Sequence, residues 1–250
     1  MKTPFFIVLS GLAFFISLCY ASISDEDTQS IHFAVAAEYP PFEYNDYGEI
    51  KGFDIDLARL IAKKLGKEVY FDTMQFSGIL PALSMGQVDA AISTITITEQ
   101  RKKNFDFTEP YYFESMAAVF PKEKPIKNAK ELTDKKIAVQ LGTTMEIWLK
   151  KNAPNANILV MDNNNQTIAA LKAGHVDLVL VDGIQGAVYS QKNPGLSFAV
   201  IAQSADGYGL ALKKGSPLTQ KINQALHELE QNGELAKLKK KWLEGTQWPS

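Results

Sequence analysis

The chain has very little of several features that mark common functional classes. Its 250 residues include one cysteine and three histidines, so the chain can form no internal disulfide and has few soft metal ligands. Neither sign of charge dominates, because 26 Lys and Arg residues oppose 28 Asp and Glu residues and the formal net charge is −2 at pH 7. Nucleic-acid-binding proteins normally carry a basic face. We therefore expect no nucleic-acid partner.

The motifs of the common enzyme classes are missing as well. The sequence contains no G-x-S-x-G, no P-loop and no G-x-G-x-x-G. His32, His175 and His227 are scattered and fit no metal-ligand spacing. We interpret Asp54 and Asp56, at the start of an expected helix, as a cap and a solvated face rather than a catalytic carboxylate pair. The sequence thus predicts no catalytic residue, no metal and no cofactor.

One apolar run stands apart, at the N-terminus. Lys2 precedes the run at 5–18, and Cys19-Tyr20-Ala21 follows with small residues at its first and third positions. This layout is typical of a secretory signal peptide, and we predict cleavage after Ala21 and export of the mature chain. The run is shorter than the roughly 20 residues that span a bilayer, which disfavours an uncleaved anchor. Lipidation of Cys19 is disfavoured by the large Leu18 before it.

The rest of the chain alternates twice between apolar extended runs and amphipathic helical runs. In the first unit we expect strands at 31–35, 69–71 and 90–92 and helices at 53–65 and 79–85. In the second we expect strands at 136–140, 158–160, 176–181 and 198–202 and helices at 144–151, 166–173 and 183–190. This alternation predicts an α/β fold with parallel sheets and helices on both faces.

Two long extended stretches, at 111–120 and 208–212, flank the second unit. They suggest that the chain crosses between two lobes twice, and that the final helices, at 217–230 and 235–242, return to the first lobe. The expected division is a signal peptide at 1–21, lobe 1 at 22–115 plus 209–250, and lobe 2 at 116–208.

The segment 93–101 contains the most informative polar residues. It follows a buried strand, at the carboxyl edge where open α/β sheets bind ligands. Hydroxyls at Thr94, Thr96 and Thr98 share a face if the chain stays extended. Arg101 would lie in the first turn of a short helix, where its guanidinium can grip a carboxylate with two hydrogen bonds. Taken alone, the segment is equally consistent with a polar sheet edge and a solvated Arg101.

Four further positions allow two interpretations each. Thr144 lies in a strand-to-helix turn and either caps the helix or contacts an anion. Asp182 ends an apolar strand and either caps the next helix or accepts from an ammonium group. Tyr39, on a loop with two prolines, and Phe76 either cover a ligand or fill a core.

Together these segments resemble the polar amino-acid-binding proteins of bacterial ABC importers. The similar motifs read, in order, YPPFEY, GFDIDLARLIAKKLGK, FSGILPALSMGQVDAAIS, TITITEQRKKNFDFTEPYY, GTTME and KKKWLEG, and they cover essentially the whole mature chain. The resemblance implies two Rossmann-like lobes joined by two extended hinge strands, the periplasmic binding protein type II fold. It also implies a periplasmic monomer that closes around an amino acid and presents it to an ABC membrane permease.

The resemblance assigns roles to residues at both ends of the ligand. Arg101 matches the arginine that binds the α-carboxylate, assisted by Thr94 and Thr144. Asp182 matches the carboxylate that takes the α-ammonium, with Ser93 and Thr96 facing the ligand. Aromatic walls and side-chain contacts complete the set of candidate ligand-binding residues: Tyr39, Glu43, Phe76, Ser93, Thr94, Thr96, Arg101, Gln140, Thr144 and Asp182.

The side chain of the ligand is less constrained. Relatives that bind basic amino acids often carry an acidic or amide residue three positions before the loop aromatic, and here that position is Ala36. Glu38 and Glu43 are acids that could substitute, and Gln140 and Met145 are further candidates. We expect a basic amino acid, arginine first, or another polar one. The alternatives are a glutamine-specific binder and an enzyme like the periplasmic cyclohexadienyl dehydratases, for which Glu43 and the hydroxyl groups are the acid/base candidates.

Overall fold

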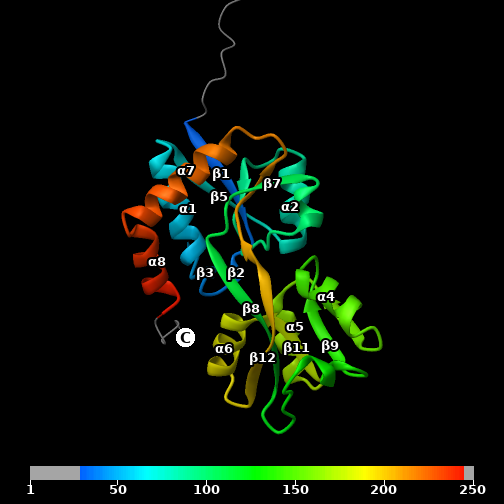
Figure 1. The fold of residues 1–250 in the computed structure, drawn as a ribbon. Helices are drawn as coiled ribbons and strands as arrows, with labels where there is room; N and C mark the ends of the chain where they lie inside the picture. Colours follow the sequence, from blue (N-terminus) through cyan, green and yellow to red (C-terminus); the bar gives the residue numbers. More distant parts are fainter. Residues whose placement is uncertain (1–28, 245–250) are drawn as a thin grey trace, which may run out of the picture.

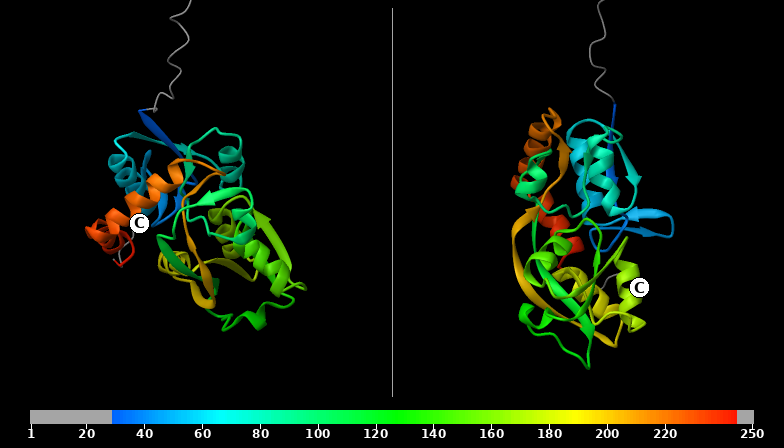
Figure 2. Two further views of the ribbon diagram at one scale, coloured as in Figure 1. Left: turned by 45° about the horizontal axis from the view of Figure 1, so that its top comes forward. Right: turned by 90° about the vertical axis from the view of Figure 1, so that its right-hand side faces the viewer.

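The computed structural model describes residues 29–244, without the side chains of residues 204 and 205. The predicted signal peptide at 1–21 lies outside the described residues. The described chain folds into two α/β lobes, each built on a five-stranded sheet, and the views in Figures 1 and 2 show the same division. No helix of this part of the chain is at once long and apolar enough to cross a bilayer.

Lobe 1 contains the first sheet. Its strands, in spatial order, are β5 (Glu68–Thr73), β1 (Ser30–Val35), β6 (Ala90–Ala91), β13 (Ala211–Lys213) and β7 (Phe105–Phe107). Its helices are α1 (Phe53–Lys64), α2 (Phe76–Ser84), α3 (Glu99–Lys102), α7 (Leu218–Gln231) and α8 (Glu234–Trp242). Helices α1, α7 and α8 pack on one face of the sheet and α2 on the other, as Figure 1 shows.

Lobe 2 contains the second sheet. Its strands, in spatial order, are β10 (Asn157–Met161), β9 (Lys136–Gln140), β11 (Leu178–Asp182), β8 (Tyr112–Pro121) and β12 (Leu196–Tyr208). Its helices are α4 (Thr144–Asn152), α5 (Asn164–Lys172), α6 (Gly183–Lys192) and the short 3₁₀ helix η1 (Ala129–Leu132). Apolar residues of α4 and η1 fill one face of the sheet, and those of α5 and α6 the other.

Both sheets are mixed, so the prediction of parallel sheets was only partly correct. Strands β1, β5 and β6 are parallel, as are β9, β10 and β11. One strand in each sheet runs the opposite way: β13 pairs antiparallel with β6 and β7 in lobe 1, and β8 pairs antiparallel with β11 and β12 in lobe 2. A strand that is buried on both faces has the same apolar sequence whichever way it runs. The pattern therefore located these strands without giving their direction.

Two strands carry the chain between the lobes. β8 and β12 pair antiparallel from Leu196 opposite Pro121 to Tyr208 opposite Tyr112, with register shifts along the way. Figure 1 shows them running side by side from one lobe into the other. The first crossing lies where the sequence indicated it. The second was placed too late, because β12 makes the crossing and the residues after Tyr208 join the first sheet as β13.

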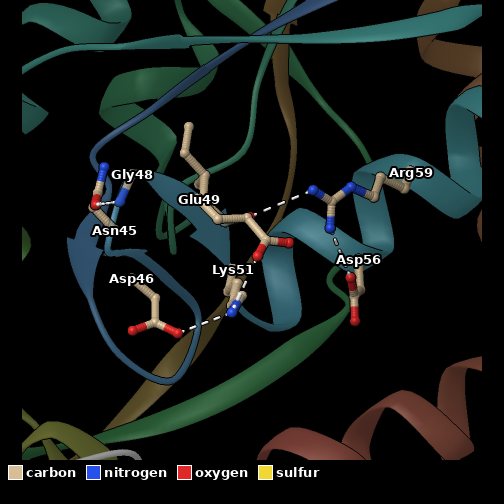
Figure 3. A network of polar contacts seen from close by, with 8 residues as sticks. Asn45, Asp46, Gly48, Glu49, Lys51, Asp56 and Arg59 are labelled. Carbon is tan, nitrogen blue, oxygen red and sulfur yellow. Dashed lines mark hydrogen bonds and ion pairs between the residues drawn. The ribbon is translucent and has the colours of Figure 1, made fainter.

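A small three-stranded sheet, which the sequence pattern did not predict, follows β1. It consists of β2 (Glu38–Tyr39), β3 (Glu43–Asp46) and β4 (Glu49–Lys51). In Figure 3, Lys51 bridges Asp46 at 2.9 Å and Glu49 at 3.1 Å. Arg59 of α1 donates to Asp56 and to a β4 carbonyl, which ties the small sheet to that helix. Exposed pairs of this kind each contribute about 0–1 kcal/mol, so they orient the sheet more than they stabilise it.

Gly52 brings the start of α1 against the loop that follows Tyr39. Its φ is +132°, and a Cβ at this position would lie 2.1 Å from the carbonyl oxygen of Phe42. The N–H groups of Phe53 and Asp54 donate to the carbonyls of Pro41 and Phe42 at 2.9 and 2.8 Å. Only glycine allows this approach, which holds the aromatic loop and the first turn of α1 together.

Gly52→Ala should therefore be strongly destabilising. The added methyl group meets backbone atoms and the φ value is unfavourable for alanine, so we expect a loss of about 3 kcal/mol or more. Gly48→Ala is the matched control, because its φ is also positive, at +94°, but nothing lies within 4 Å of the added Cβ. It should cost about 1 kcal/mol. Urea denaturation measures both, and equal losses would contradict the close-approach argument.

Candidate functional site

A cleft between the lobes gathers nearly all the predicted site residues. Nine of the ten line it, and Ser93 is the exception. The lining residues are Ala36, Glu38, Tyr39, Glu43, Phe76, Thr94, Thr96 and Arg101 from lobe 1, and Gln140, Thr143, Thr144, Met145, Asn164, Leu180, Val181 and Asp182 from lobe 2. Many of these residues lie at the carboxyl ends of strands or in the segments that follow them, which is where open α/β sheets form ligand sites.

Arg101 lies in the short helix α3, as predicted. Thr98 is the N-cap of this helix, and its hydroxyl accepts from the Arg101 N–H at 3.1 Å. The guanidinium donates to the carbonyl of Thr96 at 2.7 Å and, across the cleft, to that of Gly142 at 3.0 Å. It lies over the Phe76 ring, 5.9 Å from the centroid. Burial lowers the pKa of Arg101 to about 10, so it remains a cation at neutral pH.

No acidic side chain among residues 29–244 forms an ion pair with Arg101. Its hydrogen-bond acceptors are neutral carbonyls, which satisfy hydrogen bonds without balancing the charge. A partly buried cation that the protein leaves unneutralised favours an anion in the cleft, and a planar guanidinium suits a carboxylate.

Thr94 departs from the extended conformation that the sequence suggested. Its φ is +47°, in the left-handed region, so the hydroxyls of Thr94, Thr96 and Thr98 do not share a face. The Thr98 hydroxyl caps α3, and the Thr94 N–H donates to Asp54 at 2.9 Å. The backbone N–H of Thr94 is therefore already used, and its side chain is what remains for the cleft.

Ser93 lies beneath the cleft, fully buried. Its hydroxyl donates to Glu43 at 2.8 Å and accepts from the Ala36 N–H at 3.0 Å. Glu43 itself is only 1% exposed, and it lies against Asp54. The interpretation of Asp54 as a cap or a solvated residue is wrong, because Gly52 precedes the helix and Asp54 is completely buried. Glu43 therefore forms the floor of the cleft, and Ser93 and Asp54 lie beneath it.

Asp182 ends β11 and precedes α6, but its side chain makes no capping hydrogen bond. Its carboxylate instead accepts from the hydroxyl of Tyr39 in the other lobe. Burial raises the pKa of Asp182 to about 7, and the hydroxyls of Tyr208 and Tyr39 oppose that rise. Two phenols use only part of the acceptor capacity of a carboxylate, which has about four lone-pair sites, so Asp182 can accept from a further donor.

The start of α4 uses two threonines in different ways. Thr143 is the N-cap, and its hydroxyl accepts from the Glu146 N–H at 3.4 Å and donates to the Gln140 carbonyl at 2.7 Å. Thr144 is the first helical residue. Its hydroxyl lies 3.5 Å from that of Thr96, which belongs to the other lobe. Capping thus falls to Thr143 and leaves Thr144 in the cleft.

Glu38, Gln140 and Asn164 form a polar group that spans the two lobes. The Gln140 amide donates to Glu38 at 3.1 Å and accepts from Asn164 at 2.9 Å. Burial raises the pKa of Glu38 to about 7, against the effect of the Gln140 hydrogen bond. The sequence named Glu38 as an alternative acid but missed Asn164. The signal for Asn164 was its position just beyond the carboxyl end of β10.

The lobes touch directly across the cleft in this conformation. Tyr39 meets Asp182, Arg101 meets Gly142, and Glu38 meets Gln140. The cavity that remains measures about 30 Å³, which is room for a water molecule but not for an amino acid. A larger ligand can enter only if the lobes separate and these contacts exchange for contacts with the ligand.

The charges of the cleft divide by position. Arg101 is an unneutralised cation on one side, and Asp182 and Glu38 are carboxyl groups elsewhere in the lining. The described residues hold no group of three or more His, Cys, Asp or Glu side chains placed to bind a metal ion. The arrangement can bind a small molecule that carries both an anionic and a cationic group.

Comparisons with known proteins agree over most of the chain. Residues 31–245 match the sequence model of a family described as "Bacterial extracellular solute-binding proteins, family 3". The arginine-binding extracellular protein ArtP of Bacillus subtilis (strain 168) is 35% identical over 247 residues, which are 96% of this chain and 96% of ArtP. The structure of an ancestral arginine-binding protein bound to arginine has a TM-score of 0.83 at 40% identity, and the match covers 86% of this chain and 98% of that protein's chain. An ancestral arginine-binding protein bound to glutamine has a TM-score of 0.84 at 40% identity, with coverages of 87% and 99%.

Tyr39→Phe tests the contact between the lobes. It removes the donor to the buried Asp182 carboxylate and should destabilise the protein by roughly 1–3 kcal/mol at pH 8. At pH 5.5, below the pKa of about 7, Asp182 is protonated and the loss should shrink. Thermal unfolding at the two pH values measures the difference. Tyr47→Phe, at a fully exposed tyrosine, should change neither curve. A pH-independent loss in Tyr39→Phe would contradict a role through Asp182.

Proposed function

The chain belongs to the bacterial extracellular solute-binding proteins of family 3, and on this premise we propose that it captures free L-arginine between its lobes and delivers it to an ABC import permease. The observation that carries the proposal is Arg101, a cation with no acidic partner among residues 29–244, in a cleft that also contains Asp182 and Glu38. The α-carboxylate of an amino acid supplies the missing anion, and its α-ammonium needs a carboxylate that accepts its hydrogen bonds.

The two ends of the ligand backbone engage opposite lobes. Arg101 of lobe 1 grips the α-carboxylate in place of its bond to the Gly142 carbonyl, with the Thr96 and Thr144 hydroxyls nearby. Asp182 of lobe 2 accepts from the α-ammonium. Only the closed arrangement completes both sets of hydrogen bonds, so the ligand shifts the equilibrium between open and closed forms towards closure. Closure is then the signal that the permease reads.

Charge balance favours arginine over glutamine. Arg101, Asp182 and Glu38 together carry one net negative charge when all three are ionised, and arginine carries one net positive charge. Glutamine is neutral overall and would leave Glu38 without a cationic partner, or force it to stay protonated. The Gln140 and Asn164 amides continue the polar wall beyond Glu38. The arginine-binding names of similar proteins support this assignment.

The boundaries and location follow the same proposal. Lobe 1 comprises residues 22–115 plus 209–250 and lobe 2 residues 116–208, with β8 and β12 as the hinge. We assign residues 1–21 to a signal peptide that directs the mature chain to the periplasm, where it acts as a monomer without a nucleic-acid partner. These assignments rest on the sequence pattern together with the extracellular character of the family.

One observation favours an enzyme instead. Glu38 and Asp182 both have a pKa of about 7, the range in which general acids and bases work. We propose binding alone, because both carboxyls are hydrogen-bonded across the lobes and serve as cation acceptors. The Glu43 carboxyl, the acid/base candidate of the sequence analysis, lies buried in the floor. Turnover of prephenate or arogenate by the purified protein would establish the enzymatic alternative.

Isothermal titration of the purified protein against the twenty amino acids tests the function, and arginine should bind most tightly. Arg101→Ala should weaken arginine binding by about 100-fold or more, because it removes two charge-assisted hydrogen bonds at once. Lys102→Ala, the exposed neighbour on α3, is the control and should bind as the unchanged protein does. The proposal fails if no amino acid binds at millimolar concentration, and the site assignment fails if Arg101→Ala binds normally.

The ratio of the glutamine and arginine dissociation constants isolates the role of Glu38. Asp182 contributes to both ligands and cancels in the ratio. Below pH 7 Glu38 becomes protonated and loses its attraction for a guanidinium, so the preference for arginine should fall by up to tenfold per pH unit towards pH 5.5. Above pH 8 the preference for arginine over glutamine should become independent of pH. In Glu38→Gln the ratio should be smaller and independent of pH. A pH-independent preference in the unchanged protein would contradict the guanidinium contact.

A further inference from the structure

Two buried carboxyl groups meet beneath the cleft. Glu43 is on β3 and Asp54 is in the first turn of α1, and their exposed fractions are 1% and 0%. None of the ion pairs within residues 29–244 includes either residue. Buried acids without a cation are costly unless hydrogen bonds or protons neutralise them.

Each carboxyl has one oxygen that is satisfied and one that is not. Glu43 Oε1 accepts from the Ser93 hydroxyl at 2.8 Å, and Asp54 Oδ2 accepts from the Thr94 N–H and the Tyr111 hydroxyl, both at 2.9 Å. Within the described chain, no N–H or O–H group of another residue donates to Glu43 Oε2 or to Asp54 Oδ1. The two carboxyl groups lie within hydrogen-bonding reach of each other, and these free oxygens are the atoms left for that contact. Two carboxylates only accept, so a hydrogen bond between them requires a proton.

The surrounding groups place that proton on Glu43. Asp54 Oδ2 accepts two hydrogen bonds, whereas Glu43 Oε1 accepts one, so the negative charge is better stabilised on Asp54. The other titratable groups that face the pair are Tyr111, ahead of β8, and Asp182, on β11, and neither brings a positive charge. Burial, followed by the charge of Asp54, holds the pKa of Glu43 well above its usual range.

We propose that Glu43 and Asp54 share a single proton, and that this proton locks the Ser93–Thr94 turn in the geometry that the ligand site requires. Thr94 has a φ of +47°, which a non-glycine residue rarely adopts, and the Asp54 carboxylate holds its N–H in place. The residue before Thr94 is held as well, because the Ser93 hydroxyl donates to the Glu43 carboxyl group. Loss of the proton would set two buried anions against each other, directly under the segment that leads to Thr96 and Arg101.

The shared proton can be tested without any ligand. When folding raises the pKa of a group, the protein loses stability as the pH rises from the pKa of that group in the unfolded state to its pKa in the folded state. For one proton, the unfolding equilibrium constant should increase tenfold per pH unit above about pH 4.5. In Glu43→Gln the amide can donate to Asp54 and accept from Ser93, so this slope should disappear. Urea denaturation between pH 4.5 and 8.5 gives the unfolding constants of the unchanged protein and of Glu43→Gln. The change of their ratio with pH measures the slope that is due to the shared proton.

A second variant and a control make the measurement specific. Asp54→Asn keeps an acceptor for Thr94 and Tyr111 and supplies an amide donor to Glu43, so it should also abolish the slope. Asp56→Asn, on the same helix, removes an acid whose pKa is lowered and which is ionised throughout this range. Its curve should run parallel to that of the unchanged protein. If the Glu43→Gln and Asp54→Asn curves also run parallel to it, no proton is shared.

The second half of the inference, the effect on ligand binding, rests on the proposed function. Asp54→Asn, at a buried residue outside the cleft lining, should bind arginine within about threefold of the unchanged protein at pH 7, because the lock is preserved. Asp54→Ala, which deletes the lock, should bind at least tenfold more weakly while remaining folded by circular dichroism. Unchanged binding in a folded Asp54→Ala would overturn the locking role. If the unchanged protein binds no amino acid, the proposed function fails, while the stability measurement still decides whether the proton is shared.

Discussion

The antiparallel pairing of β8 with β12 is the constraint on which the rest of the structure depends. Both strands begin or end against lobe 1 and continue into the sheet of lobe 2, so each lobe is attached to the other by two backbone strands. Two connections restrict the relative motion of the lobes to bending and twisting of that ribbon, whereas one would leave them free to rotate. The paired strands therefore fix which residues face each other across the cleft.

The ribbon explains why residues distant in sequence form one site. Thr96 bridges to Tyr208 at the end of β12, which places the segment leading to Arg101 beside the crossing strands. Asp182 ends the strand next to β8 in the other lobe. Closure therefore brings Arg101, Tyr39 and Asp182 into one cleft, with polar partners on both sides. The floor of the cleft is polar as well, because the carboxyl groups of Glu43 and Asp54 lie beneath Ser93 and Thr94.

Sequence patterns predicted the fold and named nine residues that line the cleft, and their failures have physical causes. Strands β9 and β11 and helices α4 and α6 lie within a few residues of their expected positions, since apolar periodicity and capping are local. The direction of β13 and the small sheet β2–β3–β4 were missed, because strand pairing depends on partners far along the chain. Asp54 was misread for the same reason: its neighbours at Glu43 and Tyr111 are remote in sequence.

The amino-acid sequence by itself determined which residue types stand at the carboxyl ends of the strands, and so which chemistry is available: a cation at Arg101 and acids at Asp182 and Glu38. Local rules suffice for this, because the strand, the turn and the cap are set by neighbouring residues. Only the tertiary structure decided which of these side chains face the cleft, which are consumed by other contacts, as at Ser93, and which acids share a buried floor. Burial and pairing arise from long-range packing, and they set whether a carboxyl group carries a charge or a proton.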